Sequence, residues 1–181
     1  HMRIKMSALG LAALAMFAGQ TARAATTVDG SITVTPVAVV SLTLTTTFYA
    51  FGSVDVNTST KSITSLALNN IGTVGATVQK NIVTEASGWT AQAAAGADQY
   101  VLYAAASVSA SAPGDAGFSN AASKFAAGLA LNNLTNTGGA VQTTLAATSG
   151  TTNLWYKLDM PTTSATQAAR MITVRYTGTA Q

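Results

Sequence analysis

The sequence predicts an all-β protein, a single β-sandwich of immunoglobulin-like or jelly-roll-like type with about nine to ten strands. Apolar side chains alternate with Ser or Thr in SITVT (31–35), SLTLT (41–45) and MITVRYT (171–177). This alternation is typical of strands that have one buried and one exposed face. Turn signals rich in Gly, Asn and Pro separate the segments, and short strands at such spacing favour a sandwich or a barrel.

The remaining strands are predicted by the same pattern. Pro36 interrupts the first apolar run, and because proline cannot donate to a ladder it marks an edge, a bulge or a strand that passes between sheets. We expect further strands at 48–56, 62–69, 75–83, 88–93, 99–106, 140–146 and 154–160.

One segment has helical spacing. Phe118, Ala121, Ala122, Phe125 and Leu129 recur at the i, i+3, i+4 intervals of one helix face. We therefore expect a short helix near 118–129; Gly128 disfavours a helix, and a loop followed by a strand is the alternative.

The C-terminal stretch LWYKLDMPTT places two aromatic and two charged residues within five positions. Period-two alternation places Leu154, Tyr156, Leu158 and Met160 on one face of a strand. Trp155, Lys157 and Asp159 take the other face and form a candidate exposed patch for a ligand or an interface. We expect this strand to form a hairpin with 171–177, joined by a long polar loop. A solvated strand face is the simpler interpretation of the two charges.

Residues 1–24 read as an export leader. His1 precedes Met2 and is interpreted as a cloning remnant. Arg3 and Lys5 precede an apolar run, and Ala22-Arg23-Ala24 has the small residues of a cleavage site, which is the layout of a secretory signal peptide. The apolar run is too short to span a bilayer. We expect cleavage to leave 25–181 as one secreted or cell-surface domain with no membrane span.

Charge argues against a nucleic-acid partner. The chain carries nine basic and six acidic residues, but Arg3, Lys5 and Arg23 belong to the leader. Residues 25–181 therefore have six of each sign and no excess positive charge to hold a phosphate backbone. Charged residues make up only 8% of the chain, so little electrostatic repulsion opposes self-association.

The sequence lacks the residue types that most catalytic and metal sites need. There is no Cys, and the only His is His1, so Ser-His-Asp and Cys-His catalysis and zinc sites are excluded. A pair of carboxylates for glycoside hydrolysis stays open because six acids exist. No acid sits in a distinctive motif, and no cofactor is expected.

The aromatic residues leave a glycan-binding alternative open. Two tryptophans and several tyrosines could stack against sugars, or they could form the core; this set is Trp89, Trp155, Tyr49, Tyr100, Tyr103 and Tyr156. Tyr100 and Tyr103 are predicted to lie on opposite faces of their strand, and core or interface packing is favoured for Trp155.

The stretches GSITVTPVAVVSLTL, FGSVDVNTST, GWTAQAAAGADQYVLYAA and ITVRYTGTAQ resemble a group of exported bacterial surface proteins, a resemblance that carries no activity with it. The chain is also loosely similar to wall-attached β-sandwich proteins with a WxL motif, but Trp155-Tyr156-Lys157-Leu158 is one residue too long, so wall attachment is not implied. Its export leader, Thr-rich strands and few charges resemble those of pilin-like and matrix-filament subunits.

The expected function is that of a non-enzymatic extracellular structural protein, a self-assembling surface or filament subunit. A carbohydrate-binding adhesin module with a surface glycan as partner is one alternative, and a secreted hydrolase with paired carboxylates is another. The candidate assembly strand lies within Thr26–Val40 and presents Val28, Ile32 and Val34 before Pro36. Such a strand can complete the sheet of a second copy, or it can be the first strand of its own sandwich.

Overall fold

The computed structural model describes residues 31, 33–139, 141–165 and 168–181. The chain divides into two units, one up to Pro36 and one from Val37 to Gln181. The described residues of the first unit, Ser31 and 33–36, are exposed and have no regular secondary structure. Val34 is 78% exposed. Val28 and Ile32 lie outside the described residues.

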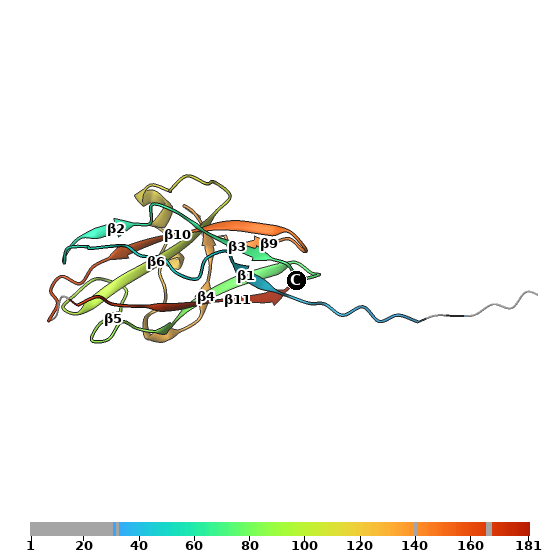
Figure 1. The fold of residues 1–181 in the computed structure, drawn as a ribbon, viewed down its shortest axis with the longest axis horizontal. Coiled ribbons are helices and arrows are strands. Elements are labelled where there is room, and N and C mark those ends of the chain that lie inside the picture. The colour runs from blue at the N-terminus through green and yellow to red at the C-terminus, as the bar shows by residue number, and fades with distance from the viewer. Residues whose placement is uncertain (1–30, 32, 140, 166–167) are drawn as a thin grey trace, which may run out of the picture. The chain divides into compact units, whose positions relative to one another are not determined.

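The second unit is a β-sandwich of two sheets, which confirms the predicted fold class (Figure 1). The larger sheet has the order β1 (Leu42–Leu44), β3 (Leu66–Asn70), β10 (Gly150–Asp159), β6 (Gln99–Ser107) and β5 (Thr90–Ala91), with β2 (Ser59–Lys61) also paired to β10 and β8 (Thr135–Asn136) to β6. The smaller sheet has the order β11 (Thr173–Ala180), β4 (Ala76–Thr84) and β7 (Asn132–Asn133), with β9 (Thr144–Leu145) also paired to β4.

The core lies between the sheets and follows the period-two pattern of the strands. In β4, Val78 and Ile82 are buried while their neighbours are half-buried. In β10 and the residue after it, the predicted inward face is confirmed, because its apolar residues all belong to the main core cluster: Leu154, Tyr156, Leu158 and Met160. Burial of these alternating side chains is the dominant favourable term for a sheet that packs on another sheet.

The predicted C-terminal hairpin is wrong. β10 pairs with β2, β3 and β6, whereas β11 pairs with β4 in the other sheet. The two strands face each other across the core, and the hydroxyl of Tyr176 donates a hydrogen bond of 2.8 Å to that of Tyr156. Both strands bury one apolar face, and two such faces can be covered by each other as well as by a shared sheet.

Three other expected elements differ from the structure, and the first is the strand at 31–35, whose described residues have no regular secondary structure. In place of one helix near 118–129, three short 3-10 turns occupy Asp115–Phe118, Ala121–Ser123 and Ala127–Leu129. Gly128 has a φ of 69°, which breaks helical continuity as its sequence position suggested. The segment 48–56, expected as a strand, has no strand residues and lies as an irregular stretch after β1.

Candidate functional site

The predicted patch of Trp155, Lys157 and Asp159 shares one face of β10, but it is not an exposed aromatic surface. Trp155 is only 2% exposed, which contradicts its place in an exposed patch and agrees with the core packing that was favoured for this residue. Its ring packs with Tyr103 and Phe118 in a second apolar cluster on the outer side of the larger sheet. The turn that contains Phe118 covers this face, a long-range contact that no local pattern predicts.

The two charged members of the patch form a partly buried polar network. The Nζ of Lys157 lies 3.3 Å from Oδ1 of Asp159. Asp159 also accepts hydrogen bonds from the hydroxyls of Ser59 (2.6 Å) and Tyr103 (2.7 Å). Burial raises the pKa of Asp159, but these hydrogen bonds and the Lys157 charge outweigh it and hold the pKa below its ordinary value. The network joins β2, β6 and β10, so its evident role is to tie these strands together.

The aromatic residues considered for sugar stacking are mostly internal. Trp89 is 8% exposed and donates from Nε1 to the Ser164 hydroxyl at 3.0 Å. Tyr100 and Tyr103 lie in different apolar clusters, on opposite sides of the larger sheet, as predicted. Tyr156 is buried. These rings therefore pack into the two apolar clusters, and Tyr49, Trp89 and Tyr156 also line a large cavity of the second unit.

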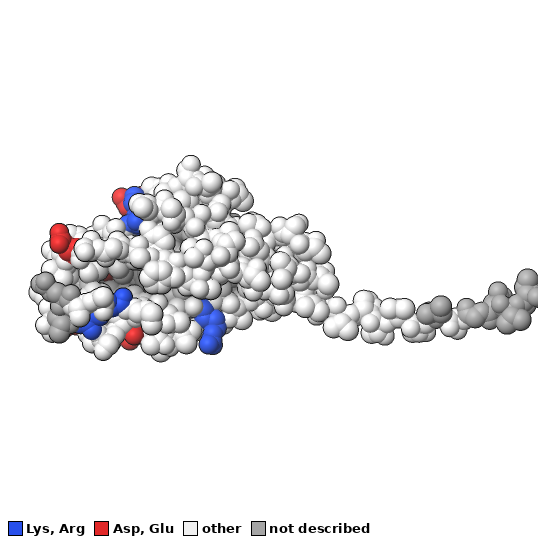
Figure 2. All heavy atoms as spheres, in the orientation of Figure 1, with Lys and Arg blue, Asp and Glu red and all other residues white. Residues whose placement is uncertain are grey.

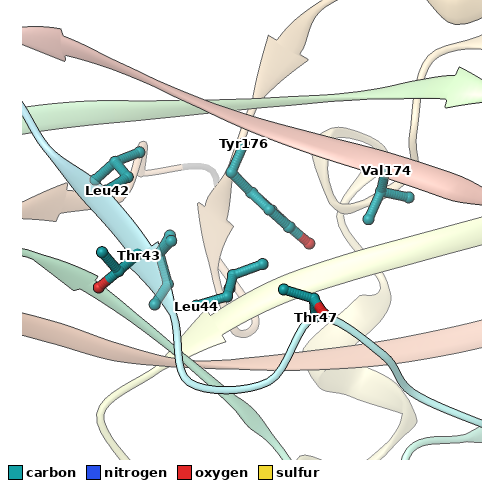
Figure 3. Close-up of a pocket in the computed structure, with 7 residues that line it drawn as sticks. Leu42, Thr43, Leu44, Thr47, Val174 and Tyr176 are labelled. Atoms are coloured by element: carbon teal, nitrogen blue, oxygen red, sulfur yellow. The ribbon is translucent and has the colours of Figure 1, made fainter.

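The open feature of the sandwich is the seam between the edge strands β1 and β11. Each strand pairs with one neighbour among the described residues, β1 with β3 and β11 with β4. A groove runs along this seam, with a narrow part of about 180 Å³. We call it the β1–β11 groove, and its narrow part is lined by Leu42, Thr43, Leu44, Thr47, Leu68, Val174 and Tyr176 (Figure 3).

Hydrogen-bond alternation shows which backbone groups of β11 face the groove. The amide of Gln181 donates to the carbonyl of Gly75 at 3.0 Å, so this is a hydrogen-bonded pair. Antiparallel pairs alternate between bonded and non-bonded, and Val174, Tyr176 and Gly178 are therefore in non-bonded pairs with β4. Their N–H and C=O groups point to the free edge, while the side chains of Val174 and Tyr176 face the core.

The same argument applies to β1. Thr45 donates to the carbonyl of Ala67 at 3.0 Å, and Ile71 donates to that of Ser41 at 2.9 Å. Hydrogen-bonded and non-hydrogen-bonded pairs alternate between these two positions. Leu42 and Leu44 are therefore in non-hydrogen-bonded pairs, and their N–H and C=O groups point away from β3. Both walls of the groove thus carry main-chain N–H and C=O groups that are not paired with a neighbouring strand, beside half-buried apolar side chains. Unpaired edges of this kind can form hydrogen bonds with a strand of another chain.

One end of the groove is closed by direct contact between its walls. A Cβ built on Gly178 would lie 2.7 Å from Cγ1 of Val40 and 3.1 Å from Cδ1 of Leu42. Only a residue without a side chain allows β1 and β11 to approach this closely. The start of β1 and the end of β11 lie at this end of the sandwich (Figure 1).

The other end of the groove widens into an apolar mouth. Leu44, Thr47 and Val174 line both the narrow part and a larger cavity of about 1190 Å³. The irregular segment 47–56 and residues 168–174 form the rim of this cavity. Phe48 and Met171 on this rim are 67% and 72% exposed. Apolar surface that is grouped in this way, in place of scattered single residues, is typical of interaction sites.

A buried lysine lies on β4, the strand that pairs with the groove strand β11. Lys80 on β4 is the cross-strand partner of Tyr176 and is 0% exposed. Its Nζ donates to the carbonyls of Ala122 (2.7 Å) and Asn133 (2.8 Å) and lies 5.5 Å from the Phe125 ring centroid. Burial lowers the pKa of Lys80 to about 7. Burial also raises the pKa of Tyr156 to about 12 and that of Tyr176 well above its ordinary value.

Charge is sparse around the groove. Of the residues that line its narrow part and its mouth, only Asp55 and Arg170 are ionisable as Asp, Glu, Lys or Arg. On the face drawn in Figure 2, no charged side chain is visible at the end of the second unit where β1 begins and β11 ends. The groove therefore suits an uncharged, apolar occupant.

The groove residues were not identified from the sequence, although the alternation of Leu42 with Leu44 and of Val174 with Tyr176 was visible there. What was missing is the pairing of each strand, which decides whether its edge is free. No protein-family model, curated protein or solved structure matches this chain. Within the described ranges, no helix is long and apolar enough to cross a membrane, and no three His, Cys, Asp or Glu side chains form a group that could hold a metal ion.

Proposed function

We propose that the protein is a non-enzymatic extracellular structural subunit that assembles with copies of itself by strand addition. In this proposal, residues 26–36 of one copy, the donor segment, add to the free edge of β11 in the next copy. The observation that carries the proposal is the β1–β11 groove, in which a free strand edge and an apolar cleft lie side by side.

The acceptor side supplies both components of strand recognition. Val174 and Tyr176 offer outward N–H and C=O groups, deduced from the pairing of β11 with β4. Leu42 and Leu44 supply apolar contacts on the opposite wall. In strand addition the main chain provides affinity, and pockets for alternate side chains provide specificity.

The donor segment has the matching pattern. Val28, Ile32 and Val34 alternate with polar residues, so one face of an extended strand would be apolar. Eleven residues in extended conformation span about 36 Å, whereas the eight residues of β11 span about 27 Å. The segment is therefore long enough to cover the groove and still reach its own domain.

The structure narrows the original candidate segment of Thr26–Val40. Val39 accepts a hydrogen bond from the amide of Thr73 at 2.8 Å, and Ser41 accepts one from Ile71. Residues from Val37 onward belong to the second unit, so the part available for donation ends at Pro36. Removal of residues 1–24 as an export leader would leave this part as a free N-terminus.

Deletion of residues 25–35 from the exported protein tests the proposal. We expect the intact protein to form oligomers or filaments, seen by size-exclusion chromatography and negative-stain microscopy, and the shortened protein to stay monomeric. An intact protein that is monomeric at high concentration, or a shortened one that assembles equally well, would show the proposal to be wrong.

A pair of point variants provides a matched control. Ile32→Asp places a carboxylate on the apolar face of the donor segment, where the groove would have to bury it at high cost. Thr33→Asp places the same charge on the polar face one residue away. We expect the first variant to prevent assembly and the second to assemble as the parent does. If the two variants assemble equally well, the apolar face of the donor segment does not contact the groove.

A further inference from the structure

We infer that the donor strand enters the β1–β11 groove from its wide end, lies antiparallel to β11, and thereby builds an open head-to-tail filament. This inference rests on the proposed strand addition and specifies its direction. It follows from the different construction of the two ends of the groove and from the point at which the chain enters its own sandwich.

The two walls of the groove run in opposite directions. Gly178 lies against Val40 and Leu42, whereas Val174 lines the groove together with Leu44 and Thr47. As β1 advances from the closed end to the mouth, β11 runs from the mouth to the closed end. A strand between them must therefore be antiparallel to one wall and parallel to the other, so its direction has only two solutions.

The closed end selects one of these solutions. Val40 and Leu42 occupy the space at Gly178, so a strand cannot continue straight out of the groove there. The donor segment has one free end, its N-terminus, and its other end is attached to a folded domain at Val37. The free tip can stop against the closed end, whereas the attached end has to leave the groove through the mouth.

The donor strand therefore runs from the Gly178 level to the Val174 level, opposite to β11. This direction gives a regular antiparallel ladder on the outward groups of Tyr176 and Val174, which is the slightly more stable pairing per residue. The exposed apolar rim at the mouth, with Phe48 and Met171, then lies where the donor's own domain would be seated.

The direction also sets the symmetry of the assembly. Val39 is bonded to Thr73, and Val40 lies over Gly178, so each chain enters its second unit at the closed end of its own groove. The attachment of the donor segment and the mouth that receives one thus lie at opposite ends of the sandwich. A contact between two different surfaces that does not close on itself produces a filament and not a symmetric dimer.

Disulfide mapping in the exported protein tests the direction, because the chain contains no cysteine of its own. Acceptor variants carry Thr173→Cys or Thr177→Cys, two exposed positions on β11. Donor variants carry a cysteine at one of the polar positions of the donor segment: Thr27, Asp29, Ser31, Thr33 or Thr35. Pairs of variants are mixed, assembled and oxidised, and intermolecular disulfides are counted by mass spectrometry.

Ser111→Cys is the control acceptor, because this residue is exposed and does not line the groove.

We expect the donor position that links best to Thr173→Cys to lie about four residues later in the chain than the one that links best to Thr177→Cys. The reverse order would overturn the inferred direction while leaving strand addition intact. Assemblies in which no donor position links to β11 more than to the Ser111→Cys control would overturn both the direction and the proposed function.

Discussion

Removal of the buried amine of Lys80 should abolish a specific pH dependence of stability. The folded protein holds this amine without exposure, and burial lowers its pKa from 10.5 to about 7. Between these two values the unfolded chain binds a proton that the folded protein does not. The free energy of unfolding therefore rises with pH over this window, and the penalty of burying the charge is present in full only below pH 7.

The size of the effect follows from the two pKa values. Each pH unit in this window is worth up to about 1.4 kcal/mol for one proton, and gradual titration near pH 7 reduces the rise between pH 7 and 9 to about 2 kcal/mol. Above pH 10 the trend reverses, because burial raises the pKa of Tyr156 to about 12 and that of Tyr176 well above its ordinary value. Those phenols ionise first in the unfolded chain, so the free energy of unfolding has its maximum between about pH 9 and 10.

Chemical denaturation between pH 6 and 10 measures this profile. We expect the parent protein and Lys124→Met to show the rise, and Lys80→Met to lack it whatever its absolute stability. Lys124 is the matched control because its Nζ also donates to a backbone carbonyl, that of Ala93, but from an exposed site. A parent profile that is flat from pH 7 to 9, or a Lys80→Met variant that retains the rise, would refute the assignment of this titration to Lys80.

Gly178→Val should lower the free energy of unfolding by about 1–3 kcal/mol in thermal melts, because its side chain would overlap Val40 and Leu42; unchanged stability would contradict the close approach of β1 and β11. Intact-mass measurement of protein exported by its native host should find Ala25 as the first residue, and a secreted species that retains Met2 would exclude the leader assignment. EDTA should leave the melting temperature unchanged, since the chain has no Cys and its only His is His1; a fall above roughly 5 °C would reveal a structural ion.

Local periodicity was sufficient for the fold class and for the inward faces of the strands. The alternation in 154–160 predicted the core positions of Tyr156 and Leu158, and the spacing of Tyr100 and Tyr103 placed them on opposite sides of one sheet, as observed. These properties depend only on the two-residue repeat of a strand.

Strand partners were beyond the reach of the same reasoning. The hairpin expected between 154–160 and 171–177 fails because β11 pairs with β4, about a hundred positions earlier in the chain. Trp155 was considered for an exposed patch and is buried because the turn at Phe118 folds over it. The β1–β11 groove itself exists only because two edge strands from distant parts of the sequence meet at Gly178 and diverge beyond it.

Backbone hydrogen exchange on β11 tests the central proposal most directly. Val174 and Tyr176 turn their amides to the free edge, while Arg175 and Thr177 donate theirs toward β4. We expect the amides of Val174 and Tyr176 to exchange fast in the monomer and to become protected on assembly, with those of Arg175 and Thr177 protected in both states. An assembled protein in which Val174 and Tyr176 exchange as fast as in the monomer would contradict strand addition at this edge.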